Sequence, residues 1–116
     1  MNQNWVPPLG MRRVLSSPRQ RSEMLDASIW SKGLLWEDLS IIGVNTELWE
    51  ADAGTQLCRE GDPGLYMALV LEGEVVVQKN AANGSLQPLA TITSGRTFGE
   101  MAMVDRQPRS ANLMVS

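Results

Sequence analysis

The chain has 116 residues, of which 43% are hydrophobic, so it can form one small domain with a core and is not disordered throughout. It has one cysteine, Cys58, which excludes an internal disulfide framework. It has no histidine, the commonest metal ligand and the commonest general base in proteins. The net charge is −3, and no apolar run approaches the roughly 20 residues that span a membrane. We therefore expect no membrane span and a reducing, cytoplasmic location.

The charge is unevenly distributed along the chain. Residues 1–22 hold four arginines and no acidic residue, and the remainder holds all 13 acidic residues. An acidic domain repels phosphates, so we expect this chain alone to bind no nucleic acid. Because VPPLG and SSPRQRS interrupt any periodic element, we interpret residues 1–22 as a flexible basic tail, with an organelle transit peptide as the alternative. The domain would then span residues 23–116.

Apolar residues fall near helical spacing after Ser22, which is a candidate helix cap. A second helical piece is predicted in LLWEDLSIIG, where Gly43 would end it. We expect a helical lead-in over residues 23–43, in which Trp30 and Trp36 serve as packing residues.

Residues 45–116 are predicted to be β structure, because short apolar runs alternate there with turn residues about every ten positions. This spacing favours a sandwich or barrel over βαβ units. The pair Asn83-Gly84 is a strong hairpin signal, since both residues tolerate a positive φ. Pro88 suits an edge strand or a strand start, and Cys58 is expected to be an inert strand residue.

The segment FGEMAMVDRQPRSA, residues 98–111, has the composition of an anion-binding loop. A glycine at position 99 lets backbone amides approach a ligand, and EMAMV can form a helical turn whose free N–H groups point toward an anion. Pro108 ends that turn and predicts a strand beginning at Arg109. The Arg109 guanidinium matches a phosphate, and Glu100 can accept hydrogen bonds from a sugar hydroxyl.

An ion pair between Arg109 and Glu100 that closes a surface loop explains the same spacing, and the loop residues alone favour neither interpretation. The P-loop pattern is absent, and nothing resembles a nucleophile with a positioned base. We therefore expect a binding domain and no enzyme.

Three motifs in register resemble the cyclic nucleotide-binding domain family. FGEMAM followed by PRSA is similar to its phosphate-binding cassette, and AGTQLCREGDPG and LVLEGEVVV resemble two upstream segments of the family. Order and spacing agree across residues 47–116, which is far more specific than the loop alone. The resemblance implies a mainly β fold: an antiparallel β-barrel or jelly roll (double-stranded β-helix) with N-terminal helices and a short helix in the cassette.

The resemblance also implies ligand contacts. In the family the glutamate binds the ribose 2′-hydroxyl and the arginine binds the cyclic phosphate, roles that fall to Glu100 and Arg109. Nearby backbone N–H groups would complete the cradle, and the serine after the arginine does not settle the choice of base. No metal or cofactor is implied, and the ligand would be cyclic AMP or cyclic GMP. The expected ligand-binding residues are Gly99, Glu100, Met101, Ala102, Arg109, Ser110 and Ala111.

The sequence departs from the family pattern at several places. Leu65 stands where an acidic residue is usual, and Ala68 stands where an aromatic is usual, with Tyr66 shifted. Family members continue past the arginine strand into another strand and lid helices. Since the sequence stops at Ser116, we expect the last strand and the lid to be missing from the barrel over 45–116.

These observations predict a regulatory sensor domain that binds a cyclic nucleotide, with cyclic AMP favoured over cyclic GMP, and transmits a conformational signal. A homodimer or an effector module of a parent protein is a further expected partner. The alternative is a barrel that binds no nucleotide and serves as an interaction or oligomerisation module, since an unpaired edge strand would seek another strand.

Overall fold

The structure is a computed structural model that describes residues 5–64, 66–100 and 107–116. The chain forms two compact units, Arg12–Glu50 and the combination of Met1–Met11 with Ala51–Ser116. We call them the helical unit and the β unit. Within the described ranges, no helix is both long and apolar enough to cross a bilayer.

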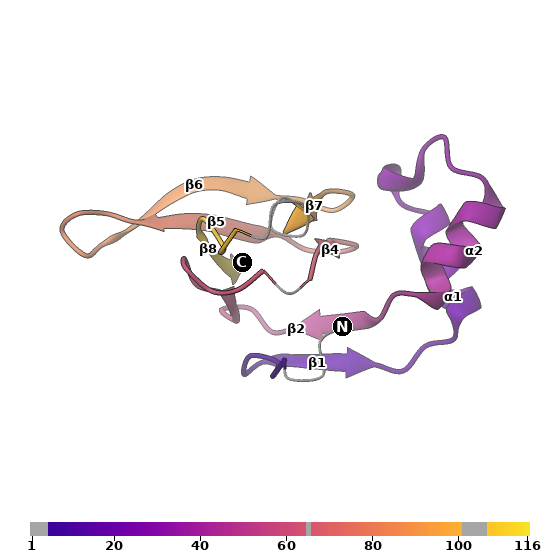
Figure 1. Ribbon diagram of the computed structural model, residues 1–116, viewed down its shortest axis with the longest axis horizontal. Helices are drawn as coiled ribbons and strands as arrows, with labels where there is room; N and C mark the ends of the chain where they lie inside the picture. Colours follow the sequence, from indigo (N-terminus) through magenta and orange to yellow (C-terminus); the bar gives the residue numbers. More distant parts are fainter. Residues whose placement is uncertain (1–4, 65, 101–106) are drawn as a thin grey trace. The chain divides into compact units, whose positions relative to one another are not determined.

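The helical unit contains α1 (Pro18–Asp26), a short 3-10 helix η1 (Ile29–Ser31) and α2 (Trp36–Val44) (Figure 1). Helix α1 begins where the sequence supplies a complete cap. The Ser17 hydroxyl accepts the backbone N–H of Gln20, and the Gln20 side chain accepts the backbone N–H of Ser17. Pro18 fits the first turn because the backbone N–H that proline lacks has no partner within the helix at that position. Helix α1 therefore begins inside residues 1–22, the segment expected as a tail.

Helices α1 and α2 pack closely at a glycine. Leu39 is fully buried, and the hydroxyl of Ser22 lies 2.9 Å from the Pro18 carbonyl oxygen and 3.0 Å from that of Leu39. A Cβ added to Gly43 would collide with the Ser22 hydroxyl and lie 2.8 Å from the Pro18 carbonyl oxygen. The predictions that Ser22 caps a helix and that Gly43 ends one are wrong, because both residues form the contact between the helices.

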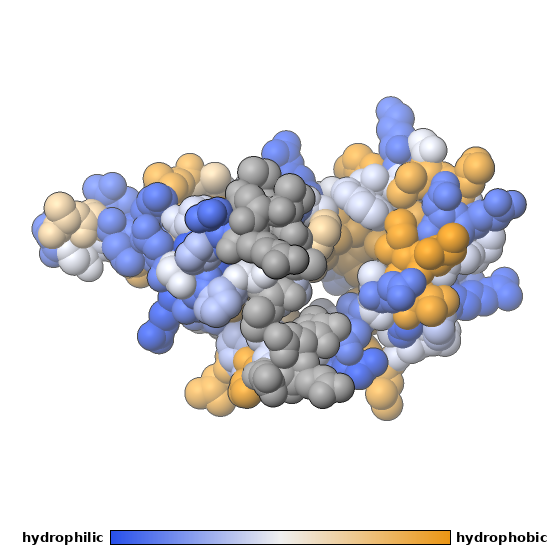
Figure 2. Space-filling model, in the orientation of Figure 1, coloured by the Kyte–Doolittle hydropathy of each residue, from blue (hydrophilic) through white to orange (hydrophobic). Residues whose placement is uncertain are grey.

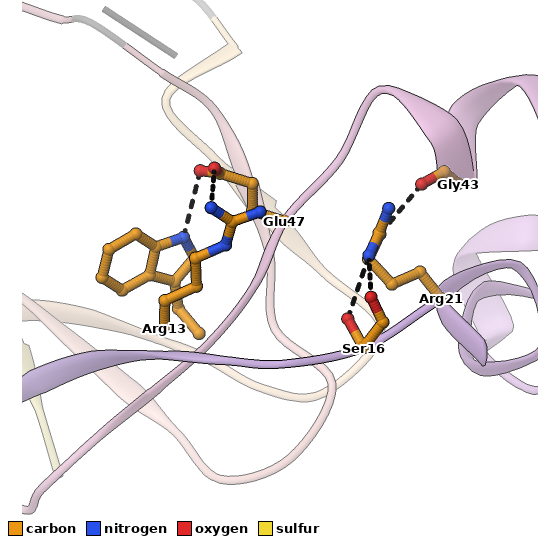
Figure 3. Close-up of polar contacts among 6 residues, drawn as sticks. Arg13, Ser16, Arg21, Gly43 and Glu47 are labelled. Atoms are coloured by element: carbon orange, nitrogen blue, oxygen red, sulfur yellow. Dashed lines mark hydrogen bonds and ion pairs between the residues drawn. The ribbon is translucent and has the colours of Figure 1, made fainter. Parts of the chain in front are cut away.

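Arg21 joins three segments of the helical unit (Figure 3). Its Nε donates to the Gly43 carbonyl oxygen at 2.9 Å, and its Nη1 donates to the Ser16 carbonyl oxygen at 2.6 Å. The other arginines of residues 1–22 form ion pairs: Arg12 with Glu50 at 2.7 Å, Arg13 with Glu47 at 3.3 Å and Arg19 with Glu23 at 3.1 Å. Three arginines of residues 1–22 therefore form ion pairs with acidic residues that lie later in the sequence.

Apolar side chains remain exposed on the helical unit, where Figure 2 shows them gathered over the helices. The larger ones are Met24, Ile29, Leu34, Leu35, Trp36, Ile41 and Val44. The helical unit therefore leaves several large apolar side chains exposed to solvent.

Short strands in antiparallel pairs make up most of the β unit, as the turn spacing predicts (Figure 1). One sheet has the order β3 (Gln56–Cys58), β8 (Asn112–Val115), β5 (Val75–Asn80) and β6 (Leu86–Ile92). A second pair in this unit joins β4 (Ala68–Leu69) to β7 (Thr97–Phe98), and a third pair, which belongs mostly to the helical unit, joins β1 (Met11–Val14) to β2 (Leu48–Ala51). The described strands thus form three small sheets and do not close into one barrel.

The hairpin predicted at Asn83-Gly84 is confirmed. Strands β5 and β6 pair antiparallel across this turn, and Gly84 has a φ of +84°. Strand β6 lies at the edge of its sheet, and Pro88 is beside a register shift of the pairing. The prediction of an edge position for Pro88 is therefore confirmed. An edge strand tolerates proline because one side of the strand has no neighbour that needs a backbone N–H donor.

The core of the β unit gathers apolar residues from most of its strands: Leu57, Cys58, Val70, Val75, Phe98 and Leu113. Cys58 lies in β3, which confirms the prediction of a strand residue, and it is 9% exposed. Strand β6, by contrast, faces solvent, with Leu86 49% and Leu89 58% exposed. A helical turn was predicted for the EMAMV segment. Glu100 is the one residue of this segment that the structure describes, and it is helical.

Candidate functional site

Arg109 lies in irregular backbone just before β8 and is 7% exposed. Its N–H donates to the Asp62 carbonyl oxygen at 2.7 Å, and its carbonyl oxygen accepts the Gly61 N–H at 2.8 Å. The Asp62 carboxylate accepts the Arg59 N–H at 2.8 Å and so closes the turn that holds Arg109. The strand predicted to begin at Arg109 begins instead at Asn112, because this turn occupies both backbone groups of Arg109.

The Arg109 guanidinium contacts Tyr66 and passes over Gly99. Its Nη2 donates to the Tyr66 carbonyl oxygen at 2.5 Å, and its Cζ lies 5.1 Å from the centre of the Tyr66 ring. Gly99 has a φ of +87°, and a Cβ there would collide with Nη1 of Arg109. Glycine at position 99 therefore gives both the backbone conformation and the space that the guanidinium needs.

No ion pair joins Arg109 to a carboxylate among the residues that the structure describes, and Glu100 is exposed. The alternative in which Arg109 and Glu100 close the loop by a salt bridge is thus not the arrangement seen. A buried cation that contacts a carbonyl group and an aromatic ring keeps its net positive charge. This arrangement suits an anionic ligand.

The remaining predicted site residues are less closely associated with Arg109. Ser110 is exposed and Ala111 is half-buried, with its carbonyl oxygen 3.8 Å from the Cys58 sulfur. Met101 and Ala102 lie outside the described residues. The structure therefore brings Gly99 and Arg109 together and leaves the wider cradle untested.

Tyr66 contacts Arg109, and sequence reasoning did not include it in the candidate site. Its ring packs edge-on against Phe98, at 6.4 Å between centres, and against Trp5, at 5.3 Å. Burial, then the neighbouring Cys58, raises the pKa of the Tyr66 hydroxyl. That hydroxyl is buried without a hydrogen-bond partner among the described residues. The signal in the sequence was its displacement from the position where the family usually has an aromatic.

A cavity of about 670 Å³ lies in the β unit beside Arg109. Its walls include Arg109, Tyr66 and Cys58, and the segment around Trp5 lines it as well. Burial raises the pKa of the Cys58 thiol, which keeps this one side chain of the wall protonated at neutral pH. In the described part of the chain, no group of three or more cysteine, aspartate or glutamate side chains could hold a metal ion. The volume is in the range of small-molecule sites.

The chain is similar to several known proteins. It is 31% identical to a cyclic nucleotide-binding domain of Methylobacillus flagellatus KT, whose crystal structure aligns over 92% of this chain and 62% of that one with a TM-score of 0.79. It is 37% identical, over 53% of its length, to a cAMP-dependent protein kinase regulatory subunit of Aspergillus niger, and 39% identical, over 53%, to a cyclic nucleotide-gated potassium channel of Mesorhizobium japonicum. The match covers 14% and 15% of those two proteins.

The family model for the cyclic nucleotide-binding domain matches residues 48–116. The antiparallel strands and the two helices agree with the jelly-roll fold of these relatives, which confirms the predicted fold class. The family match also covers Gly99 and Arg109, the two site residues that the structure brings together. The chain belongs to the cyclic nucleotide-binding domain family.

Proposed function

We propose that this chain is a regulatory domain that binds a cyclic nucleotide, with cyclic AMP favoured over cyclic GMP. Arg109 binds the cyclic phosphate and Glu100 the ribose 2′-hydroxyl. Backbone groups at Gly99 complete the phosphate cradle, together with those of Met101 and Ala102. Ser110 and Ala111 border the phosphate on the side of β8.

One observation carries this proposal: a buried guanidinium, 7% exposed, whose positive charge no described carboxylate neutralises. A phosphate offers two oxygens that match the donor fork of arginine. Bound beside Gly99, it would supply the countercharge that Arg109 lacks.

The preference for cyclic AMP is supported by the names of the relatives. Three curated relatives, from Aspergillus niger, Neurospora crassa and Colletotrichum trifolii, are called cAMP-dependent protein kinase regulatory subunits. A solved structure of the enzyme Bd1971, 30% identical over 54% of this chain, is described in both cAMP-bound and cGMP-bound forms. Cyclic GMP is therefore the competitor to be measured.

Calorimetric titration of Arg109 variants tests the phosphate contact. Arg109→Ala should reduce cyclic AMP affinity at least about tenfold, because a charge-assisted hydrogen bond to phosphate contributes about 1.5–3 kcal/mol. Arg109→Lys keeps the charge but loses the fork, so its affinity should lie between the two. Exposed Arg96 is the matched control, and Arg96→Ala should bind like the wild type. Wild-type affinity in a folded Arg109→Ala variant would remove Arg109 from the site.

The role of Glu100 is tested by a cycle that removes either partner of the contact. Wild-type protein should bind 2′-deoxy cyclic AMP more weakly than cyclic AMP, whereas Glu100→Ala should bind the two about equally. If Glu100→Ala still discriminates between them, another residue contacts the 2′-hydroxyl.

The proposed role is regulatory and involves no chemical step by this domain. Ligand binding would order the phosphate loop and shift the conformational population of the helical segment over residues 23–43. The exposed apolar residues of the helical unit support this, since such a surface suits contacts that change with state. Amide hydrogen exchange should change over this segment when cyclic AMP is added, and unchanged exchange would refute transmission through it. We also propose that the domain acts on an effector module of a parent protein and that it is located in the cytoplasm.

A second candidate function, an interaction module without nucleotide, is favoured by the exposed edge strand β6 with Leu86 and Leu89. Thermal denaturation with millimolar cyclic nucleotide separates the two candidates. A raised midpoint supports the nucleotide site, and an unchanged midpoint together with a dimer in light scattering supports the module.

A further inference from the structure

Burial makes the Arg109 guanidinium dependent on compensating contacts. A buried charge is costly unless an opposite charge or good hydrogen-bond acceptors surround it. The sequence contains no acidic residue between Asp62 and Glu72, and among the described residues no carboxylate pairs with Arg109. Tyr66 supplies both the hydrogen-bond acceptor and the aromatic ring that contact this guanidinium in the structure.

Tyr66 contacts the guanidinium in two ways. Its carbonyl oxygen accepts a hydrogen bond from Nη2, and its ring centre lies 5.1 Å from Cζ, within the distance of a cation–π contact. Phe98 and Trp5 pack edge-on against the ring at interplanar angles of 70° and 69°. The ring is therefore fixed between two aromatic neighbours and can orient the cation.

We propose that Tyr66 is the positioning residue of the anion site and holds Arg109 with its ring and backbone carbonyl in place of a carboxylate. The inference rests on the proposed function, because it names the residue that aims Arg109 at the phosphate. A carboxylate partner would compete with the phosphate for the guanidinium. An uncharged ring does not, so the full positive charge of Arg109 stays available to the ligand.

Two substitutions separate the ring from the hydroxyl of Tyr66. Tyr66→Phe keeps the aromatic face, and Tyr66→Leu removes it while leaving an apolar side chain. Circular dichroism and amide NMR dispersion check that both variants fold. The backbone carbonyl is present in each, so a difference between them reports on the ring.

The first measurement needs no ligand. In wild-type protein, the ring current of Tyr66 should shift the side-chain NMR signals of Arg109, which are assigned by their disappearance in Arg109→Lys. The shift should persist in Tyr66→Phe and vanish in Tyr66→Leu. If the wild-type signals show no ring-current shift, the proposal is overturned whatever the nucleotide affinity.

The second measurement is cyclic AMP affinity. Tyr66→Leu should bind about 2- to 30-fold more weakly than wild type, the range of one cation–π contact, while Tyr66→Phe should match wild type. In an Arg109→Ala background, Tyr66→Leu should cause no further loss. Equal losses in the Phe and Leu variants would overturn the role of the ring and assign the effect to the hydroxyl. If the ring-current shift is present but the wild type binds no cyclic nucleotide, the proposed function fails while the ring contact stands.

Discussion

Replacing Gly99 by alanine separates backbone strain from a steric collision at the proposed anion site. Gly99 has a φ of +87°, and a Cβ there would collide with Nη1 of Arg109 and lie 2.7 Å from the Tyr66 carbonyl oxygen. Gly73 has nearly the same φ, +84°, but nothing lies within 4 Å of an added Cβ. Gly73→Ala should lower the free energy of unfolding by about 1–2 kcal/mol, the cost of the left-handed backbone alone. Gly99→Ala should lower it by a further 1–3 kcal/mol, roughly the cost of overpacking.

Urea denaturation of both variants gives the two free energies, and titration with cyclic AMP gives the affinities. We expect Gly73→Ala to bind like the wild type and Gly99→Ala to bind more weakly, because the new methyl group displaces the guanidinium. Equal losses of stability in the two variants, with unchanged affinity in both, would refute the close approach of Gly99 to Arg109.

Three further predictions concern stability. Arg21→Ala should lower the free energy of unfolding by about 2–3 kcal/mol, because carbonyl groups of two segments lose a charged donor, whereas exposed Arg19→Ala should change it by about 0.5 kcal/mol or less in the same urea assay. Asn112 is 3% exposed and its side chain accepts the Glu60 N–H, so Asn112→Ala should cost about 1–3 kcal/mol, and a smaller loss would show that water replaces the bond. Burial raises the pKa of the Cys58 thiol above its ordinary 9.0, so the unfolded chain loses that proton first. Stability should therefore fall as pH rises above 9, and less steeply in Cys58→Ala; parallel curves would contradict this.

Local signals in the sequence predicted the parts of the fold that local physics determines. The hairpin at Asn83-Gly84 needs only two residues that accept a positive φ, and the structure forms it there. Cys58 sits in the short segment TQLCRE between turn residues and lies in β3. Pro88 lacks an N–H and lies on an edge strand.

Contacts between distant segments explain most of what the sequence did not predict. Gly43 looks like a helix stop, but a collision with Ser22, 21 positions earlier, is what requires a glycine there. The backbone of Arg109 looks ready to begin a strand, but it is occupied by the turn at Asp62. Neither partner can be identified from spacing along the chain.

In the candidate site, too, the contact between residues near in sequence was predicted and the contact between distant residues was not. The motif around Gly99 and Arg109 was recognisable because the residues are close in sequence, and the structure places the two in contact distance. The contact of Tyr66 with Arg109 spans 43 positions and was not predicted. The proposed contacts of Glu100 and Ser110 stay predictions.

The position of β8 sets an order for folding. This strand, Asn112–Val115, lies between β3 and β5, so among the described strands β3 gains its neighbour in the sheet only when β8 is in place. The pairing of β5 with β6 joins segments that are close in the sequence and can form early, whereas the pairing of β3 with β8 closes a loop of more than fifty residues and is entropically slow. Because Arg109 lies just before β8, we expect its side chain to reach Tyr66 only when this late step is complete. A chain that has not finished folding would then lack the contact between Tyr66 and Arg109, so the proposed ligand site would form only in the folded domain.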